Sequence, residues 1–161
     1  MQAKTPIGWR EWVHLPQLGI PHIKAKIDTG AKTCALHAFR VDPFEREGQH
    51  WVRFALHPYQ DDTDTVVECE APVVDYRTVT NSGGHQETRY VIATQILAGD
   101  RTIDAEITLT NRETMRFRML LGRNALMGHF LVDCDAAFLL ETPPMPESER
   151  SEHEDCDTVE E

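Results

Sequence analysis

The sequence predicts an all-β fold, either a barrel or a sandwich, with one short helix late in the chain. Short runs of alternating apolar and polar residues, or of β-branched residues, recur along most of its length. Turn-forming residues separate these runs at short intervals, and helix-compatible residues followed by a glycine occur in one late segment, residues 122–128. Many short strands joined by frequent turns are typical of barrels and sandwiches.

Each expected strand is a run of β-favouring residues bounded by turn signals. Residues 50–57 alternate most clearly, with Val52, Phe54 and Leu56 on one face. We expect strands at residues 7–13, 22–27, 33–41, 50–57, 65–70, 72–80, 87–97, 101–110, 117–121, 130–132 and 137–140. We expect a polar turn at residues 42–49, a loop at 58–64, and a hairpin whose glycine-rich tip covers residues 81–85.

The length and the charge distribution predict one domain followed by a tail. The chain has 161 residues and a formal net charge of −11, of which −8 lies in residues 141–161. A proline-rich stretch at residues 142–146 precedes this acidic run. We therefore expect a folded domain over residues 1–141 and a disordered acidic tail over residues 142–161. No basic stripe is present, so nucleic acid is not an expected partner.

Several sequence signals bear on the cellular compartment. No apolar run approaches the length of a membrane helix, so no membrane partner is expected. The first twelve residues lack a signal-peptide pattern. The four cysteines contain no Cys-x-x-Cys pair and are expected to be free thiols. We expect a cytoplasmic protein.

The chemistry suggested by the sequence centres on Asp28-Thr29-Gly30, which ends the β-favouring run of residues 22–27. A strand that delivers a carboxylate to a glycine turn places it at the edge of a sheet, and Gly30 lets the chain double back. Such a carboxylate can act as a general base on water when a second carboxylate shares its proton. Taken alone, the tripeptide is also compatible with an ordinary surface turn.

Two further features follow in a fixed order: the glycine-rich hairpin of residues 81–85 and the segment Leu120-Leu121-Gly122-Arg123-Asn124. This order resembles the retropepsins, the single-lobe aspartic proteases of retroviral type. The resemblance implies a closed β-barrel in which Asp28, Thr29 and Gly30 form the catalytic turn. It also implies that the hairpin closes over the substrate, and that Leu121, Gly122 and Arg123 support the turn from behind.

A closer resemblance, over residues 6–141, is to a bacterial family of single-domain retropepsin-like proteins. These are labelled ATP-dependent zinc proteases and linked to RimK-type ATP-grasp ligases. The residues that carry the resemblance are Asp28-Thr29-Gly30-Ala31, Leu36-His37-Ala38, Trp51-Val52-Arg53-Phe54, Arg77, Ser82-Gly83, Glu87-Thr88-Arg89, Leu109-Thr110-Asn111-Arg112 and Leu120-Leu121-Gly122-Arg123.

This resemblance implies a homodimeric aspartic endopeptidase in which Asp28 from each of two subunits forms one catalytic dyad. Its expected substrates are acidic peptides or peptide tags connected with an ATP-grasp ligase, which is also a candidate partner. The expected substrate-binding residues are Ala31, Arg77, Ser82, Gly83, Gly84, Glu87 and Arg89. Arg77 and Arg89 can bind acidic side chains or a C-terminal carboxylate. Their alternative role is in cross-strand ion pairs on a solvated hairpin.

One position departs from the viral pattern. Viral retropepsins commonly carry an acid two residues after the glycine, where it pairs with the Arg of Gly-Arg-Asn, but this chain has Lys32 there. Lys32 and Arg123 would repel each other, so Arg123 needs another partner. The departure bears directly on whether a viral-style dimer forms.

The zinc and ATP labels have little support in the residues. No His-Glu-x-x-His or nucleotide-binding Gly-x-x-x-x-Gly-Lys motif is present. On a strand, Cys34 and His37 point to opposite faces, and His129, Asp133 and Cys134 form a loose group. We expect no metal site and no cofactor. A non-catalytic peptide-binding module and a zinc-dependent peptidase remain the alternatives.

Overall fold

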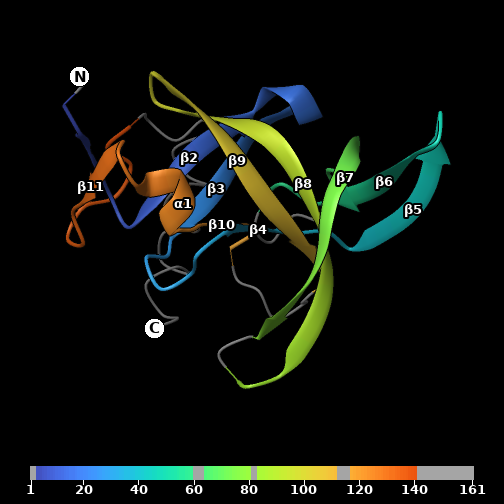
Figure 1. Ribbon diagram of the computed structural model, residues 1–161. Helices are drawn as coiled ribbons and strands as arrows, with labels where there is room; N and C mark the ends of the chain where they lie inside the picture. Colours follow the sequence, from blue (N-terminus) through green and yellow to red (C-terminus); the bar gives the residue numbers. More distant parts are fainter. Residues whose placement is uncertain (1–2, 60–63, 81–82, 112–116, 141–161) are drawn as a thin grey trace.

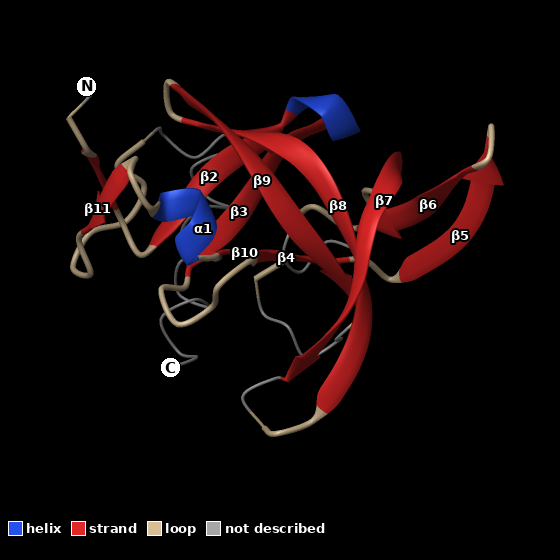
Figure 2. Ribbon diagram, viewed as in Figure 1, coloured by secondary structure: helices blue, strands red, loops and turns tan. Residues whose placement is uncertain are grey.

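The computed structural model describes residues 3–59, 64–80, 83–111 and 117–140. This part of the chain is built mainly of strands, as Figure 2 shows. The strands are β1 (Thr5–Ile7), β2 (Arg10–Leu15), β3 (Ile20–Ile27), β4 (Cys34–His37), β5 (Arg40–Arg46), β6 (Gln49–Leu56), β7 (Val67–Thr80), β8 (Gln86–Ala98), β9 (Arg101–Thr110), β10 (Met119–Leu121) and β11 (Phe130–Val132). The helices are a 3-10 helix at Pro16–Leu18 and α1 (Arg123–Leu126). The predicted all-β class and the late short helix are therefore confirmed.

Nine strands form one sheet in the order β2-β3-β10-β4-β9-β8-β7-β6-β5, and β1 pairs with β11 in a separate two-stranded sheet (Figure 1). The sheet curls so that β2 also pairs with β8, at His14 and Leu97. The ring consists of six strands, β2, β3, β10, β4, β9 and β8. One residue pair between β2 and β8 closes it. The ring is less complete than the closed barrel that the resemblance implied.

Two parallel pairings inside the ring position the site. β10 runs parallel to β3, with Leu121 opposite Ile27, and β4 runs parallel to β9. The core lies inside the ring because alternate residues of each strand are apolar. Fully buried side chains come from most of its strands and include Ile23, Leu36, Ile92, Ile107 and Met119.

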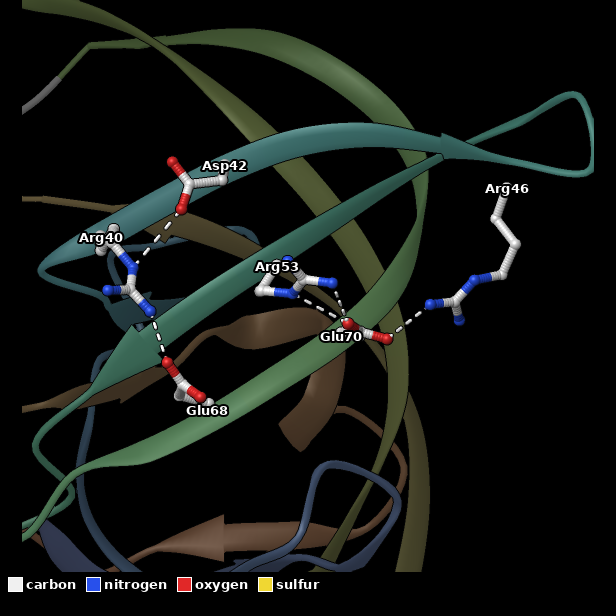
Figure 3. A network of polar contacts seen from close by, with 6 residues as sticks. All are labelled: Arg40, Asp42, Arg46, Arg53, Glu68 and Glu70. Atoms are coloured by element: carbon white, nitrogen blue, oxygen red, sulfur yellow. Dashed lines mark hydrogen bonds and ion pairs between the residues drawn. The ribbon is translucent and has the colours of Figure 1, made fainter.

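The polar segment at residues 42–49 was predicted as a turn, and this prediction is wrong. It belongs mostly to β5, which pairs with β6 from Arg40–Ala55 to Arg46–Gln49. Glu47 and Gly48 make the turn, both with positive φ. The polar residues face solvent on a side arm, where Arg40 pairs with Asp42 and Glu68 while Arg46 and Arg53 pair with Glu70 (Figure 3). Cross-strand ion pairs let a polar segment form an edge strand.

Other boundaries also differ from the prediction. Residues 33–41 divide between β4 and β5, and residues 65–80 form the single strand β7 apart from their first two positions. Residues 137–140 are not a strand, because the backbone N–H groups of Leu139 and Leu140 donate to the buried carboxylate of Glu11 instead. The predicted tail at residues 142–161 lies outside the described residues.

Within the described ranges, no helix is long and apolar enough to cross a membrane.

Candidate active site

The Asp28 turn, residues 28–31, is held in place by backbone hydrogen bonds. The Asp28 N–H donates to the Leu121 carbonyl of β10 at 2.9 Å, which extends the β3–β10 pairing by one residue. The Gly30 N–H donates to Asp28 Oδ1 at 3.0 Å, and the Ala31 N–H donates to the Asp28 carbonyl at 3.2 Å. One carboxylate oxygen of Asp28 is therefore fixed by its own turn.

The segment that begins at Gly122 packs directly behind this turn. The Arg123 N–H donates to the Ala31 carbonyl at 2.8 Å, and the Asn124 N–H donates to the Lys32 carbonyl at 3.0 Å. A Cβ atom at Gly122 would lie 2.5 Å from the Thr33 carbonyl oxygen, so this close approach requires glycine. Leu121, just before it, is fully buried. The structure thus brings together two segments that are about ninety residues apart in the sequence.

The side chain of Arg123 has the partner that the sequence left open. Its Nη1 donates to the Thr29 carbonyl oxygen at 2.9 Å. The Arg123 side chain is thereby hydrogen-bonded to the Asp28 turn, so it needs no acid at position 32 as a partner. Thr29 itself is exposed.

A cavity of about 1000 Å³ opens beside the Asp28 turn. Five of the predicted site residues line it: Asp28, Gly30, Ala31, Arg77 and Arg89. One wall comes from β7, which with β8 forms the long β7–β8 hairpin that projects from the ring (Figure 1). The structure therefore places the predicted carboxylate and two predicted cations around one space.

The other described residues of the predicted site do not line the cavity. Gly83 and Gly84 are exposed at the tip of the β7–β8 hairpin, and Ser82 lies outside the described residues. Thr29, Glu87, Leu121, Gly122 and Arg123 are not among the lining residues. Glu87 faces the protein instead and accepts hydrogen bonds from the Thr110 hydroxyl and from Arg89 Nε, the latter at 2.9 Å.

The two predicted arginines are held differently. Arg89 is 7% exposed, and its Nη1 also donates to the Thr108 hydroxyl at 3.3 Å. Arg77 is more open, with 32% of its side chain exposed. Its Nε donates to Asp75 Oδ2 at 2.7 Å and its Nη2 donates to Glu106 Oε1 at 2.8 Å. The hydrogen bond from Arg77 lowers the pKa of Asp75.

Sequence reasoning missed several lining residues. Glu106, Thr108 and Asn124 line the cavity, and so does Lys32, which the sequence marked only as a departure from the viral pattern. Glu106 and Thr108 occupy ordinary alternating positions of β9, so no motif distinguishes them. Asn124 stood in the quoted Gly-Arg-Asn segment and Lys32 directly after the Asp28 turn, so these two residues could have been proposed from the sequence.

The charged residues along the cavity are Lys32, Arg77 and Arg89 against Asp28 and Glu106. Arg77 and Arg89 are paired with Asp75 and Glu87, which are not lining residues, so the two arginines add no net positive charge to the region. An anionic ligand can bind Arg77 if it displaces one of the carboxylate partners of this guanidinium.

Among the described residues, no three His, Cys, Asp or Glu side chains gather closely enough to hold a metal ion. Cys34 and His37 are both buried on β4. Burial raises the pKa of the Cys34 thiol to about 11, which disfavours the thiolate that would bind zinc.

Comparisons with known proteins agree with this geometry. A family model described as the retropepsin-like aspartic endopeptidase RimB matches residues 6–143. A crystal structure of a Legionella pneumophila protein of unknown function superposes with a TM-score of 0.73 at 26% identity, covering 86% of this chain and 100% of the other.

Curated relatives carry the name probable alpha-L-glutamate ligase. The protein from Desulfotalea psychrophila is 49% identical over 81% of this chain, and that from Parasynechococcus marenigrum is 46% identical over 87%. The chain spans 28% and 30% of the length of these two relatives. Since the family match covers nearly the whole described chain, this protein belongs to the RimB-like family of retropepsin-like aspartic endopeptidases.

Proposed function

We propose that this chain is an aspartic endopeptidase in which Asp28 from each of two copies forms the catalytic dyad. The observation that carries the proposal is the position of Asp28, on a hydrogen-bonded glycine turn at the edge of a cavity large enough for a peptide segment. Family membership supports the same chemistry.

The dyad works because two close carboxylates cannot both ionise easily. They share one proton, and their titrations are coupled. The ionised carboxylate removes a proton from water as it attacks the scissile carbonyl, while the protonated carboxylic acid donates a hydrogen bond to the carbonyl oxygen. The hydrogen bond from the Gly30 N–H to Oδ1 leaves Oδ2 of Asp28 available for this exchange.

A second copy is required because each chain supplies one such turn. A two-fold axis beside the Asp28 turn would bring the two carboxylates together. The internal bond between Arg123 and Thr29 supports this arrangement, since Arg123 is satisfied without an acid at position 32.

The proposed substrates are acidic peptides, in particular glutamate-rich ones. Three cations that line the cavity, Lys32, Arg77 and Arg89, support this choice because each can contact a carboxylate of the peptide. The name of the relatives, probable alpha-L-glutamate ligase, supports it further, because such ligases would add the residues that this peptidase removes. A ligase is accordingly a proposed partner.

The test is cleavage of a glutamate-rich peptide at pH ~5 to 7, monitored by mass spectrometry with and without a chelator. Asp28→Asn, which keeps the shape of the side chain, should lower kcat by about a thousandfold or more. Asp100→Asn removes the same charge from the β8–β9 turn and serves as the control. Activity that survives in Asp28→Asn would contradict the proposal.

Two outcomes would favour the alternatives. Loss of cleavage on addition of chelator would indicate a metal-dependent peptidase. Tight binding of the peptide without cleavage by the wild type would indicate a peptide-binding module.

A further inference from the structure

The inference concerns Glu106, a residue of β9 whose side chain reaches past β8 to Arg77 of β7. It pairs with Arg77 at 2.8 Å on the wall of the cavity that contains Asp28. Glu106 is not adjacent to Arg77 in the sheet, because β8 lies between β7 and β9. The pair therefore depends on both side chains extending along the cavity wall.

Arg77 has two carboxylate partners of different character. Asp75 is fixed on the same strand, since its carboxylate accepts the Tyr76 N–H at 2.8 Å as well as Arg77 Nε at 2.7 Å. Glu106 makes no hydrogen bond or ion pair to a described residue other than Arg77, and 50% of its side chain is exposed. Asp75, which does not line the cavity, thus holds Nε of Arg77, while Glu106, which does line it, holds Nη2.

An exposed ion pair of this kind is weak, because water screens it and both side chains lose freedom when they pair. A carboxylate that arrives with a bound peptide can therefore replace Glu106 on Arg77 at little cost. Arg89 is a poorer candidate for such an exchange, since it is nearly buried and Glu87 is held by Thr110 as well.

We infer that Glu106 is an internal competitor for Arg77, which it occupies until a substrate carboxylate displaces it. Arg77 is then the residue that selects acidic substrates, and Glu106 sets how strongly it does so. This inference rests on the proposed function, because it takes the cavity as the substrate site. It is specific to one pair of side chains and predicts that the removal of a carboxylate improves binding.

Binding is measured in the Asp28→Asn background, so that cleavage does not interfere. The probes are a fluorescent glutamate-rich peptide and its glutamine counterpart, each with a free or an amidated C-terminus. Glu106→Gln should tighten binding of the glutamate peptide about two- to fivefold and leave the amidated glutamine peptide, which has no carboxylate, unchanged. If the amidated glutamate peptide shows the same gain in affinity, Arg77 recognises a side-chain carboxylate. If amidation abolishes the gain, Arg77 recognises the C-terminal carboxylate.

Asp104→Asn is the matched control. It removes the same charge two residues away on β9, from a carboxylate that accepts a hydrogen bond from Gln95 instead. It should leave both affinities unchanged, because the effect depends on contact with Arg77 and not on net charge. In the double variant Arg77→Gln/Glu106→Gln, the Glu106 substitution should add nothing to the weaker binding caused by Arg77→Gln.

The inference is overturned if Glu106→Gln weakens binding or leaves it unchanged, or if Asp104→Asn produces an equal gain. In the Asp28-containing protein the same substitution should lower KM for the glutamate peptide with kcat unchanged. Because affinity is measured separately, a protein that binds selectively but does not cleave would refute the peptidase and retain the Arg77–Glu106 exchange.

Discussion

Gly122 is the residue on which the position of the Asp28 turn depends most directly. The backbone of residues 122–124 contacts the carbonyl groups of Ala31, Lys32 and Thr33 with no room for a side chain at position 122. The requirement for glycine arises from close approach to backbone and not from an unusual φ angle, since φ at Gly122 is −90°. A flexible neighbouring side chain could move aside, but two packed backbone segments cannot.

Gly122→Ala should therefore lower the free energy of unfolding by about 3 kcal/mol, measured by urea denaturation. Gly48→Ala is the control, since an added Cβ there meets nothing within 4 Å and faces the strain of a φ of +79° alone. The control should cost about 1 kcal/mol. Equal stability of Gly122→Ala and the wild type would show that this contact does not restrain the turn.

The sequence predicted the local part of the site and missed the part that depends on distant contacts. A strand followed by Asp-Thr-Gly is a local signal, so the Asp28 turn was identifiable. The partner of Arg123 was not, because its contact with Thr29 joins residues 94 positions apart. Glu106 was also missed, because its importance comes from reaching Arg77 over an intervening strand.

At the level of elements, the side arm formed by β5, β6 and the first part of β7 shows how charge can stabilise a strand. Composition suggested a turn at residues 42–49, because proline and acidic residues are frequent in turns. The cross-strand contacts decide otherwise: Arg46 and Arg53 both donate to Glu70, and Arg46 also lies over the ring of Trp51. These partners lie on other strands, so the composition of residues 42–49 alone does not predict them.

The arm predicts a pH-dependent contribution from Glu70. Hydrogen bonds from Arg46 and Arg53 hold the pKa of this carboxyl below its ordinary value of 4.5. A lowered folded-state pKa contributes stability at pH values above the unfolded-state pKa, and this contribution is lost as pH falls through the folded-state pKa. In Arg46→Gln/Arg53→Gln, the pKa of Glu70 should rise toward its ordinary value, as followed by NMR titration of the side-chain carboxyl.

Arg40→Gln provides the comparison, because Arg40 lies on the same arm but pairs with Asp42 and Glu68. It should leave the pKa of Glu70 unchanged. A similar rise in both variants would mean that any arginine of the arm, and not the two hydrogen bonds in particular, lowers the pKa of Glu70.

At the scale of the whole molecule, the ring depends on pairings that local sequence cannot specify. β3 meets β10, and β4 meets β9, in parallel registers that join the early and late parts of the chain. Periodicity predicted most of the strands but not their order in the sheet. The incomplete closure between β2 and β8 was not predicted, because it depends on how strongly the sheet curls.

The central claim at this scale is that two copies of the chain share one catalytic site. The most direct measurement mixes wild type with Asp28→Asn, refolds them together at several ratios, and records cleavage of the glutamate-rich peptide. If two Asp28 carboxylates are needed, activity follows the square of the wild-type fraction, so an equal mixture retains about one quarter of the wild-type rate. Retention of about half, in direct proportion to the wild-type chains present, would show that each chain acts alone and would contradict the shared dyad.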